Sequence, residues 1–563
     1  MTSKKLRTII FGIIFLVLSI LYTMLFAPNG NVRLMDSYDL LFHMNRIQSL
    51  SNIFVSPVNF SSWGHAGNMT SLFYPWLTIF PGFLIFQLFG NPVLGFLVYL
   101  TVINFCTFVS AYYFMKKFSN NTLQSFLFSI IYTLAFFRAA SVFYRAGLAE
   151  YISYIFIPMI FYEFYQLLIG KFNKWPLFAL SFALVVMTHP LSAFTTAIML
   201  VPLVLLVLFS KTSHSWKYWL DLVYSGVKSI FFVGLTTIGF TLPMYQQQKY
   251  ISVNRPAVID LWSTAKDPVL LFQDAMKADV RSYSFGAIFV FALILLLIFV
   301  WRDQLKYKII AIEAVLALLL STNLIPWNTL QDSFLNYLQF PWRFLNPFTF
   351  FIAIYLSHIL AMLVDKRSGL LKVSVAVVMI LICSFQIYVS GTKLNGQITL
   401  VKDTPVVKQS ESNYIVRRYN QHDYYPNRSL KYFQDIGRHH FIVNDHKTKL
   451  HYKYTDSNYT VKYYNQDPVT MDIPVLVYKG LDVTINNEKT NYTISKRGTV
   501  EVKTKPGQNV IQLSYHYSTV AKAAIGLNVV SAGLLIWLCV NDGKLLYKKK
   551  KDTDTKELKS KNS

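Results

Sequence analysis

Long apolar segments dominate the pattern of the chain. Runs of about 17–25 apolar residues, the length at which a helix crosses the hydrocarbon core of a bilayer, recur from Ile9 to Val540. By this criterion we count about thirteen crossings. The first run, 9–26, follows basic residues as a signal peptide does, but no small-residue cleavage site precedes the next polar cluster. The pattern predicts a polytopic α-helical membrane protein with a retained first helix.

Two long polar segments interrupt the apolar runs and divide the chain. We expect a transmembrane domain at 1–390 that contains a first polar loop at 27–72, a separate polar domain at 391–519, a final transmembrane helix at 520–541 and a basic tail at 542–563. Within the polar domain, stretches such as 499–503 and 510–515 alternate apolar and polar residues between turn clusters. This pattern predicts a small antiparallel β-sandwich, which could serve as a lid or acceptor-docking module or, equally well, as a structural cap.

Composition and charge support a membrane class and exclude a soluble one. The 563 residues are 53% hydrophobic and 14% charged. The net charge of +25 would suit a protein that binds nucleic acid. The basic residues, however, border apolar runs, for example at Lys171, Lys366 and Lys548, and this is where cytoplasmic loops of membrane proteins carry them. We therefore expect membrane lipids, and no nucleic acid, as partners. The N-terminus and the tail are predicted to be cytoplasmic, and 27–72 and 391–519 extracytoplasmic.

Cysteine usage bears on the cellular source. All three cysteines, Cys106, Cys383 and Cys539, lie inside apolar runs, so the polar domain has no disulfide. This favours the outer face of a bacterial plasma membrane.

One stretch leaves the predicted topology open. Residues 73–115 are long enough for two crossings with a turn at 90–92, but two crossings would place Lys116 and Lys117 outside. Either the first half is re-entrant, or these two lysines depart from the charge rule.

The most informative polar cluster follows the first apolar run. Asp36, Asp39, His43 and Arg46 are spaced by three or four residues, so a helix would place them on one face, with apolar residues on the other. We expect an amphipathic helix in the membrane interface. Asp39 is the candidate general base, Asp36 and His43 are further catalytic candidates, and Arg46 is a candidate phosphate ligand. Mg²⁺ or Mn²⁺ could bind to Asp36 and Asp39. An interfacial helix with ordinary polar residues is the alternative.

Four more residues combine charge or an imidazole with an apolar setting. Arg145 and Arg343 could bind a phosphate in a bidentate manner, and each has an equally good structural explanation. Glu150 begins an apolar run, where its charge could simply complement the helix dipole. His189 lies at the predicted outer end of a run, where a hydrogen-bonded structural histidine is the commoner case. There is no Walker loop, no dinucleotide-binding glycine motif, no zinc-ligand spacing and no evident repeat.

These motifs resemble those of known families. Residues 39–343 resemble the bacterial 6-pyruvoyl-tetrahydropterin synthase-related membrane proteins, a name that implies no pterin chemistry, through Asp39-Leu-Leu-Phe-His43-Met-Asn-Arg46, Trp63-Gly64, Phe73-Tyr74-Pro75, Arg145 to Glu150 and Phe340-Pro-Trp-Arg343. The C-terminal part is similar to the YfhO family through Asp423-Tyr-Tyr-Pro426, Ile473-Pro-Val-Leu-Val-Tyr478 and Lys505-Pro-Gly-Gln-Asn-Val-Ile511.

Both families look like members of the GT-C glycosyltransferase superfamily. The resemblance implies a GT-C-like fold, Asp39 as the acidic catalytic residue and a lipid-phosphate or sugar site that includes Tyr74. Asp36 and Asp39 are three apart, whereas many such enzymes have adjacent acidic residues. The expected function is transfer of a sugar from a polyprenyl-phosphate donor, such as undecaprenyl phosphate, to an envelope acceptor such as teichoic acid. A transporter or flippase of lipid-linked saccharides and a non-catalytic envelope scaffold are the alternatives.

Overall fold

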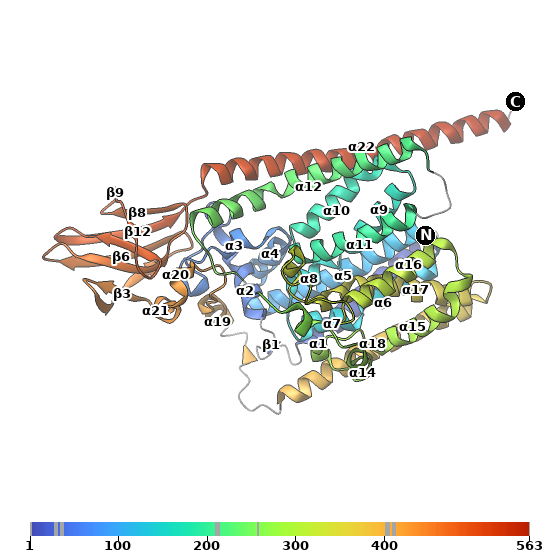
Figure 1. Ribbon diagram of the computed structural model, residues 1–563, viewed down its shortest axis with the longest axis horizontal. Coiled ribbons are helices and arrows are strands. Elements are labelled where there is room, and N and C mark those ends of the chain that lie inside the picture. Colours follow the sequence, from blue (N-terminus) through green and yellow to red (C-terminus); the bar gives the residue numbers. More distant parts are fainter. Residues whose placement is uncertain are drawn as a thin grey trace.

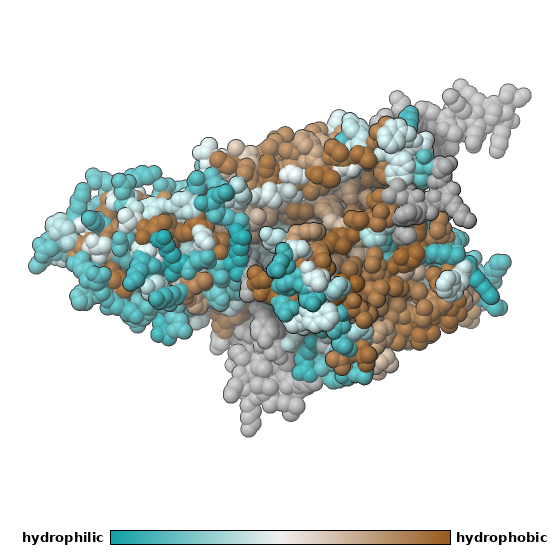
Figure 2. Space-filling model, viewed as in Figure 1, coloured by the Kyte–Doolittle hydropathy of each residue, from teal (hydrophilic) through white to brown (hydrophobic). Residues whose placement is uncertain are grey.

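The protein has a long helical part with a β-rich domain at one end. The computed structural model describes residues 3–27, 32–33, 39–208, 214–255, 258–399, 406–407 and 412–561. It is mostly helical (66%), and Figure 1 shows most of the strands gathered at the end of the helical part away from the start of α1 (Ser3–Phe26) and the end of α22 (Thr519–Lys561). Figure 2 shows a mainly apolar surface over the helices and a mainly polar one over the strands. This division agrees with the sequence-based prediction of a membrane protein with one polar domain.

Seven helical segments among the described residues are long and apolar enough to cross a membrane. They are Lys5–Phe26, Pro92–Ser119, Thr122–Phe143, Trp216–Tyr250, Pro341–Leu363, Gly369–Leu394 and Thr519–Asn541. Four shorter apolar segments accompany them: Leu77–Phe89, Phe172–Val186, Pro190–Leu205 and Ala287–Arg302. Because the shorter segments fall below the roughly 20 residues that a full crossing needs, the count of about thirteen crossings stays a prediction.

The larger α-helices of the helical part have the following bounds: α1 Ser3–Phe26, α4 Phe80–Phe89, α5 Pro92–Ser119, α6 Thr122–Thr133, α7 Phe136–Phe143, α9 Ile157–Leu168, α10 Trp175–Val186, α11 Pro190–Leu208, α12 Trp216–Tyr250, α14 Pro268–Met276, α15 Ala287–Phe299, α16 Leu305–Leu320, α17 Leu345–Leu363, α18 Gly369–Thr399 and α22 Thr519–Lys561. The other α-helices among the described residues are α2 Leu40–Gln48, α3 Thr70–Phe73, α8 Leu148–Ser153, α13 Leu261–Thr264, α19 Ser412–Arg418, α20 Asn427–Leu430 and α21 Phe433–Gly437. The predicted domain boundary at residue 390 lies inside α18, which continues to Thr399.

The length of α4 bears on the topology that the sequence leaves open. This helix has 10 residues, about 15 Å at 1.5 Å per residue, or half of a hydrocarbon core. Gly90 then reverses the chain with φ of +61°, and Asn91 caps α5 by accepting hydrogen bonds from the N–H groups of Val93 and Leu94. The half-length of α4 favours the re-entrant alternative for this segment.

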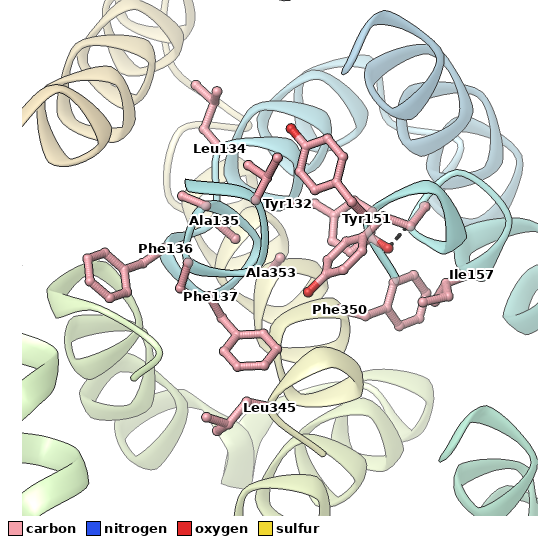
Figure 3. Packing of buried hydrophobic residues seen from close by; sticks show 14 of the residues in the cluster. Tyr132, Leu134, Ala135, Phe136, Phe137, Tyr151, Ile157, Leu345, Phe350 and Ala353 are labelled. Carbon is pink, nitrogen blue, oxygen red and sulfur yellow. Dashed lines mark hydrogen bonds between the residues drawn. The ribbon is translucent and has the colours of Figure 1, made fainter. Parts of the chain in front are cut away.

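The core of the helical part lies between α6, α7 and α17. Tyr132 of α6 and Phe350 of α17, both labelled in Figure 3, pack edge to face, with ring centroids 5.8 Å apart and an interplanar angle of 79°. Ala135 and Ala353 are also buried here. Small residues let helices approach closely inside a membrane, and the aromatic pairs then fill the remaining space. This packing fixes where α7 and the start of α17 present their polar residues.

The β domain is a sandwich of two five-stranded antiparallel sheets with orders β10-β11-β7-β3-β4 and β5-β6-β12-β8-β9. Its strands are β3 His440–Val443, β4 His446–Lys449, β5 Tyr452–Tyr454, β6 Asn458–Asn465, β7 Thr470–Leu476, β8 Leu481–Ile485, β9 Glu488–Lys489, β10 Thr493–Ile494, β11 Thr499–Lys503 and β12 Gly507–Tyr515. Along β12, alternate residues from Asn509 to Tyr515 are buried, as in a strand with one face on a core. The predicted antiparallel sandwich is confirmed. A separate pair, β1 Val32–Arg33 and β2 Val406–Val407, joins distant segments.

The first polar loop packs into the core of this sandwich. Phe60 is fully buried, with its ring centroid 5.8 Å from that of Tyr459, and the Leu476 N–H donates to the Ala66 carbonyl at 3.0 Å. Met69 belongs to the same apolar cluster. The loop and the sandwich therefore form one structural unit, although about 400 residues separate them in the sequence.

Helices α12 and α22 attach the sandwich to the helical part and run side by side (Figure 1). The buried Gln247 side chain, near the end of α12, donates to the Lys479 carbonyl at 2.8 Å and accepts from the Lys479 N–H at 3.0 Å. On the other side, the Tyr517 hydroxyl donates to the Ile53 carbonyl at 2.7 Å. These contacts hold the sandwich against the end of the helical part where the first loop lies.

Replacing Gln247 by Ala tests this attachment. The change leaves both backbone groups of Lys479 without their partner, so we expect the free energy of unfolding in detergent to fall by about 2 kcal/mol. The neighbouring Gln248→Ala is the control, because Gln248 only accepts from the exposed Arg255 side chain at 3.4 Å. Equal effects of the two changes would contradict the attachment.

Candidate functional site

The site is built around Asp39, at the N-terminus of α2. Asp39 occupies the N-cap position of α2. A capping aspartate usually accepts a hydrogen bond from an N–H group of the first turn, but the Asp39 carboxylate makes no such bond. The carboxylate instead faces the Arg145 Nε at 3.6 Å, and the Asp39 N–H donates to the Arg145 carbonyl at 3.3 Å. The Asp39 side chain is 38% exposed. A carboxylate held in this way is accessible and free of a capping role.

The expectation of an interfacial amphipathic helix here is wrong. A helix forms, but α2 has almost no exposed face, and even its polar residues His43, Asn45 and Arg46 are buried. The reason is tertiary: α19 covers α2, and the Asn45 side chain donates to the carbonyls of Val416 at 2.7 Å and Tyr419 at 2.9 Å. The predicted partner Asp36 lies outside the described residues.

His43 and Arg46 form a contact inside this buried helix. The Arg46 Nη1 lies 3.1 Å from the His43 Nδ1, and the Arg46 Nη2 donates to the Pro75 carbonyl at 2.6 Å. Because a guanidinium can only donate, the His43 Nδ1 must accept, which leaves the Nε2 of a neutral imidazole to carry the proton. The guanidinium also stacks on the Tyr74 ring, 3.7 Å from its centroid. The structure thus brings Tyr74 beside Arg46.

Arg145 lies between two carboxylates. It pairs with the buried Glu150 through its Nη2 and with Asp39 through its Nε. Glu150 lies in the first turn of α8, so its charge complements the dipole of that helix as well as pairing with Arg145. Burial lowers the pKa of Arg145, but the charges of Glu150 and Asp39 more than offset this and raise it above the ordinary value.

Arg343 and His189 complete the group, from the short 3₁₀ turn Pro341–Phe344 just before α17 and from the turn between α10 and α11. The buried Arg343 side chain donates from its Nη1 to the Leu338 carbonyl at 2.5 Å and to the Gln339 Oε1 at 3.0 Å. The His189 Nδ1 lies 2.7 Å from the Ser192 hydroxyl. Trp342 lies between the arginines, 5.5 Å from Arg145 and 5.7 Å from Arg343 as measured from Cζ to the ring centroid.

Electrostatic coupling shows that these residues converge. Burial raises the pKa of the Asp39 carboxyl above its ordinary value, and the charges of Arg145 and Arg343 oppose this rise. Burial and the charge of Arg46 lower the pKa of His43 well below its ordinary value, and burial and the charge of Arg343 do the same for His189. At neutral pH both imidazoles are therefore uncharged and the group is electropositive overall.

The three guanidinium groups have unused donors. The Nε atoms of Arg46, Arg145 and Arg343 are all buried without a hydrogen-bond partner. Within the described part of the chain, neither Arg46 nor Arg343 forms an ion pair with a carboxylate. Buried, unsatisfied charged donors are costly, and an incoming anion would satisfy them. The arrangement suits a phosphate beside a carboxylate.

Sequence reasoning missed the contribution of the polar domain to this site. Burial raises the pKa of Asp423; the charge of His422 lowers it in part, and the charge of Asp39 adds to the rise. Tyr424 stacks on Phe73, with ring centroids 5.3 Å apart. The only signal in the sequence is the short motif at 423–426, which supports the family resemblance but has no role assigned. The polar domain therefore lines the site as well as capping the first loop.

The described residues do not suit a divalent cation at Asp39. Among them, no group of three or more His, Cys, Asp or Glu side chains is placed to hold a metal ion. The groups coupled to the Asp39 carboxylate include Arg145, Arg343 and Arg46, whose charges would repel a cation. We therefore derive no step that uses Mg²⁺ or Mn²⁺.

With this geometry in view, the chain can be compared with known proteins. No family model matches it, and no curated protein matches it either. The family resemblance stays a prediction.

The raised pKa of Asp39 predicts a pH dependence. A base must be ionised, so an activity that uses the Asp39 carboxylate should fall as pH drops through a pKa above the ordinary aspartate value. Since the charge of Arg145 opposes the rise, Arg145→Gln should move this acidic limb to higher pH. The measurement is the pH profile of the activity of each variant. An Arg145→Gln limb at the same or lower pH would contradict the coupling.

Proposed function

We propose that this protein is a GT-C-type membrane glycosyltransferase that moves a sugar from a polyprenyl-phosphate donor to a cell-envelope acceptor, such as a teichoic acid, on the outer face of a bacterial plasma membrane. One observation carries the proposal: the charges of Arg145, Arg343 and Arg46 all act on one partly exposed carboxylate, that of Asp39, and the Nε groups of Arg46 and Arg343 are buried without a hydrogen-bond partner. Arginine clusters bind phosphate, and the leaving group of such a donor is a phosphate. The resemblance to GT-C families adds support.

The chemistry of this proposal uses residues already in place. Asp39 accepts the proton of the acceptor hydroxyl as the oxygen attacks the anomeric carbon of the donor sugar. The bond between that carbon and the phosphate oxygen breaks, and the phosphate leaves with the bonding electrons. The guanidinium groups neutralise the charge that develops on it, and Glu150 holds Arg145 in position. His43 carries a proton on Nε2 and could donate a hydrogen bond to the phosphate or the sugar.

The topology belongs to the same proposal. With a cytoplasmic N-terminus, α1 brings Asp39 to the outer face, and a re-entrant α4 lets α5 return Lys116 and Lys117 to the cytoplasm. The sandwich and the site then share the outer side, and α22 leads back to a cytoplasmic tail.

Transport of a lipid-linked saccharide is the alternative. Arg138 in α7 and Glu313 in α16 are fully buried, and ionisable groups inside membrane helices often mark a transport path. Arg138, however, has local partners: it donates to the Asn104 side chain at 3.0 Å and to the Thr107 hydroxyl at 3.2 Å.

A comparison in cells separates the two functions. Envelope polymers and the level of the lipid-linked sugar are measured in cells that carry the native gene, a deletion, or an expression-matched Asp39→Ala variant. We expect the deletion and the variant both to lose one sugar from the polymer and to accumulate its lipid carrier. If only the deletion changes the envelope, the catalytic role is wrong and transport or scaffolding remains.

A further inference from the structure

Two cavities lie at the end of the helical part away from Asp39. Helix α17 begins beside Arg343 and has His358 near its other end, about 22 Å along the axis at 1.5 Å per residue. In the same direction α5 runs from Asn91 to Lys116 and Lys117. The cavities are therefore separate from the site described above.

The first cavity is apolar and has a volume of about 430 Å³. Its lining comes from α5, α9, α16 and α17 and includes Phe118, Phe161, Ile309, Phe350 and Ile354. Ile169 and Leu305, which also line it, are 47% and 61% exposed, so the cavity is open to the surface beside two apolar side chains. Its volume is within the range of small-molecule sites, and its lining suits a hydrocarbon chain.

The second cavity is polar, basic and adjacent to the first. It has a volume of about 650 Å³ and is lined by Lys306, Lys366 and Arg367, with Asp365 as the one exposed acidic side chain in its lining. Lys306 lines both cavities, and its Nζ lies 5.4 Å from the centroid of Phe118, a wall of the apolar one. His358, also in the lining, is held by Asp303 at 3.0 Å.

We propose that the two cavities form one binding site for an anionic phospholipid. An acyl chain occupies the apolar cavity, and the phosphate headgroup lies against Lys306, Lys366 and Arg367. The continuity of an apolar, aromatic-lined cavity with a basic one matches an amphiphile, whereas a free phosphate would use only the polar half. Basic pockets between transmembrane helices are a known means of holding anionic headgroups.

Retention of lipid by the purified full-length protein tests the site. The protein in detergent is incubated with phosphatidylglycerol, with phosphatidylcholine, or with phosphatidylglycerol plus excess inorganic phosphate, and bound lipid is counted by native mass spectrometry. We expect preferential retention of phosphatidylglycerol that inorganic phosphate does not displace. At about fivefold per basic residue, the triple variant K306Q/K366Q/R367Q should bind it roughly 100-fold more weakly.

Two further variants sharpen the test. The triple variant K5Q/R7Q/K217Q removes three charges from exposed positions at the same end that line neither cavity, and it should bind phosphatidylglycerol like the native protein. Ile309→Trp fills the apolar cavity and should weaken retention while leaving the basic residues intact. Equal binding of both lipids, displacement by inorganic phosphate, or full retention by K306Q/K366Q/R367Q would each overturn the proposal.

Discussion

Replacing Asp39 by Asn is expected to lower the rate of sugar transfer by about 10³-fold, within the range that general-base catalysis contributes. The amide has nearly the same shape as the carboxylate but cannot accept the proton of the acceptor hydroxyl. Asp39 is 38% exposed and has no capping hydrogen bond, so the fold should tolerate the change. The measurement is single-turnover transfer from a polyprenyl-phosphate sugar by the purified protein, with thermal unfolding recorded in parallel.

Asp482→Asn is the matched control for this change. Asp482 is 39% exposed and pairs with Lys489 at 2.8 Å, so its burial and its ion pair resemble those of Asp39. It lies on β8, away from the arginines, and its replacement should leave transfer unchanged. If Asp39→Asn retained the native rate, or if both variants lost activity equally, Asp39 would not be the base.

Replacing Glu150 by Gln is expected to lower the free energy of unfolding by about 3 kcal/mol. Glu150 is only 2% exposed, and it is the buried partner of Arg145. Without its charge, Arg145 keeps only the more distant and more exposed Asp39, at 3.6 Å. A buried cation that has lost its main counter-charge is one of the few causes of so large an effect from a single substitution.

Denaturant titration of the purified protein in detergent measures this effect. Glu488→Gln serves as the control, because Glu488 and its partner Lys505 are 78% and 81% exposed and their ion pair should contribute little. Transfer should fall in Glu150→Gln as well, because Arg145 loses its fixed position. Unchanged stability would show that Asp39 alone balances the charge of Arg145.

The sandwich has a double role in these expectations. It provides the apolar core in which Phe60 and Met69 of the first loop are buried, and the segment just before it carries Asp423, whose pKa the charge of Asp39 raises, and Tyr424, which stacks on Phe73. The sequence could not choose between a lid and a structural cap. A cap requires contacts between the sandwich and the first loop, and a lid requires contacts near Asp39, and the sequence pattern records neither kind of tertiary contact. Both kinds occur together in the fold, so changes in the sandwich should affect both stability and activity.

The sequence alone determined the features that depend on local pattern. Apolar runs indicated membrane helices, alternation indicated the strands at β11 and β12, and the glycine and proline at 90–92 indicated the turn before α5. It also selected Asp39, His43, Arg46, Arg145 and Arg343, because charged side chains are costly beside apolar segments and need a reason to be there.

Only the tertiary structure decided how these parts combine. The pattern of α2 is that of an amphipathic surface helix, but α19 covers it, and its polar residues are buried beside Tyr74 and Pro75. The shared environment of Asp39, Arg145, Arg343 and Asp423 depends on segments hundreds of residues apart, and no local period records such a contact. Periodicity reflects whether a side chain is buried, whereas its neighbour is set by the packing of the whole chain.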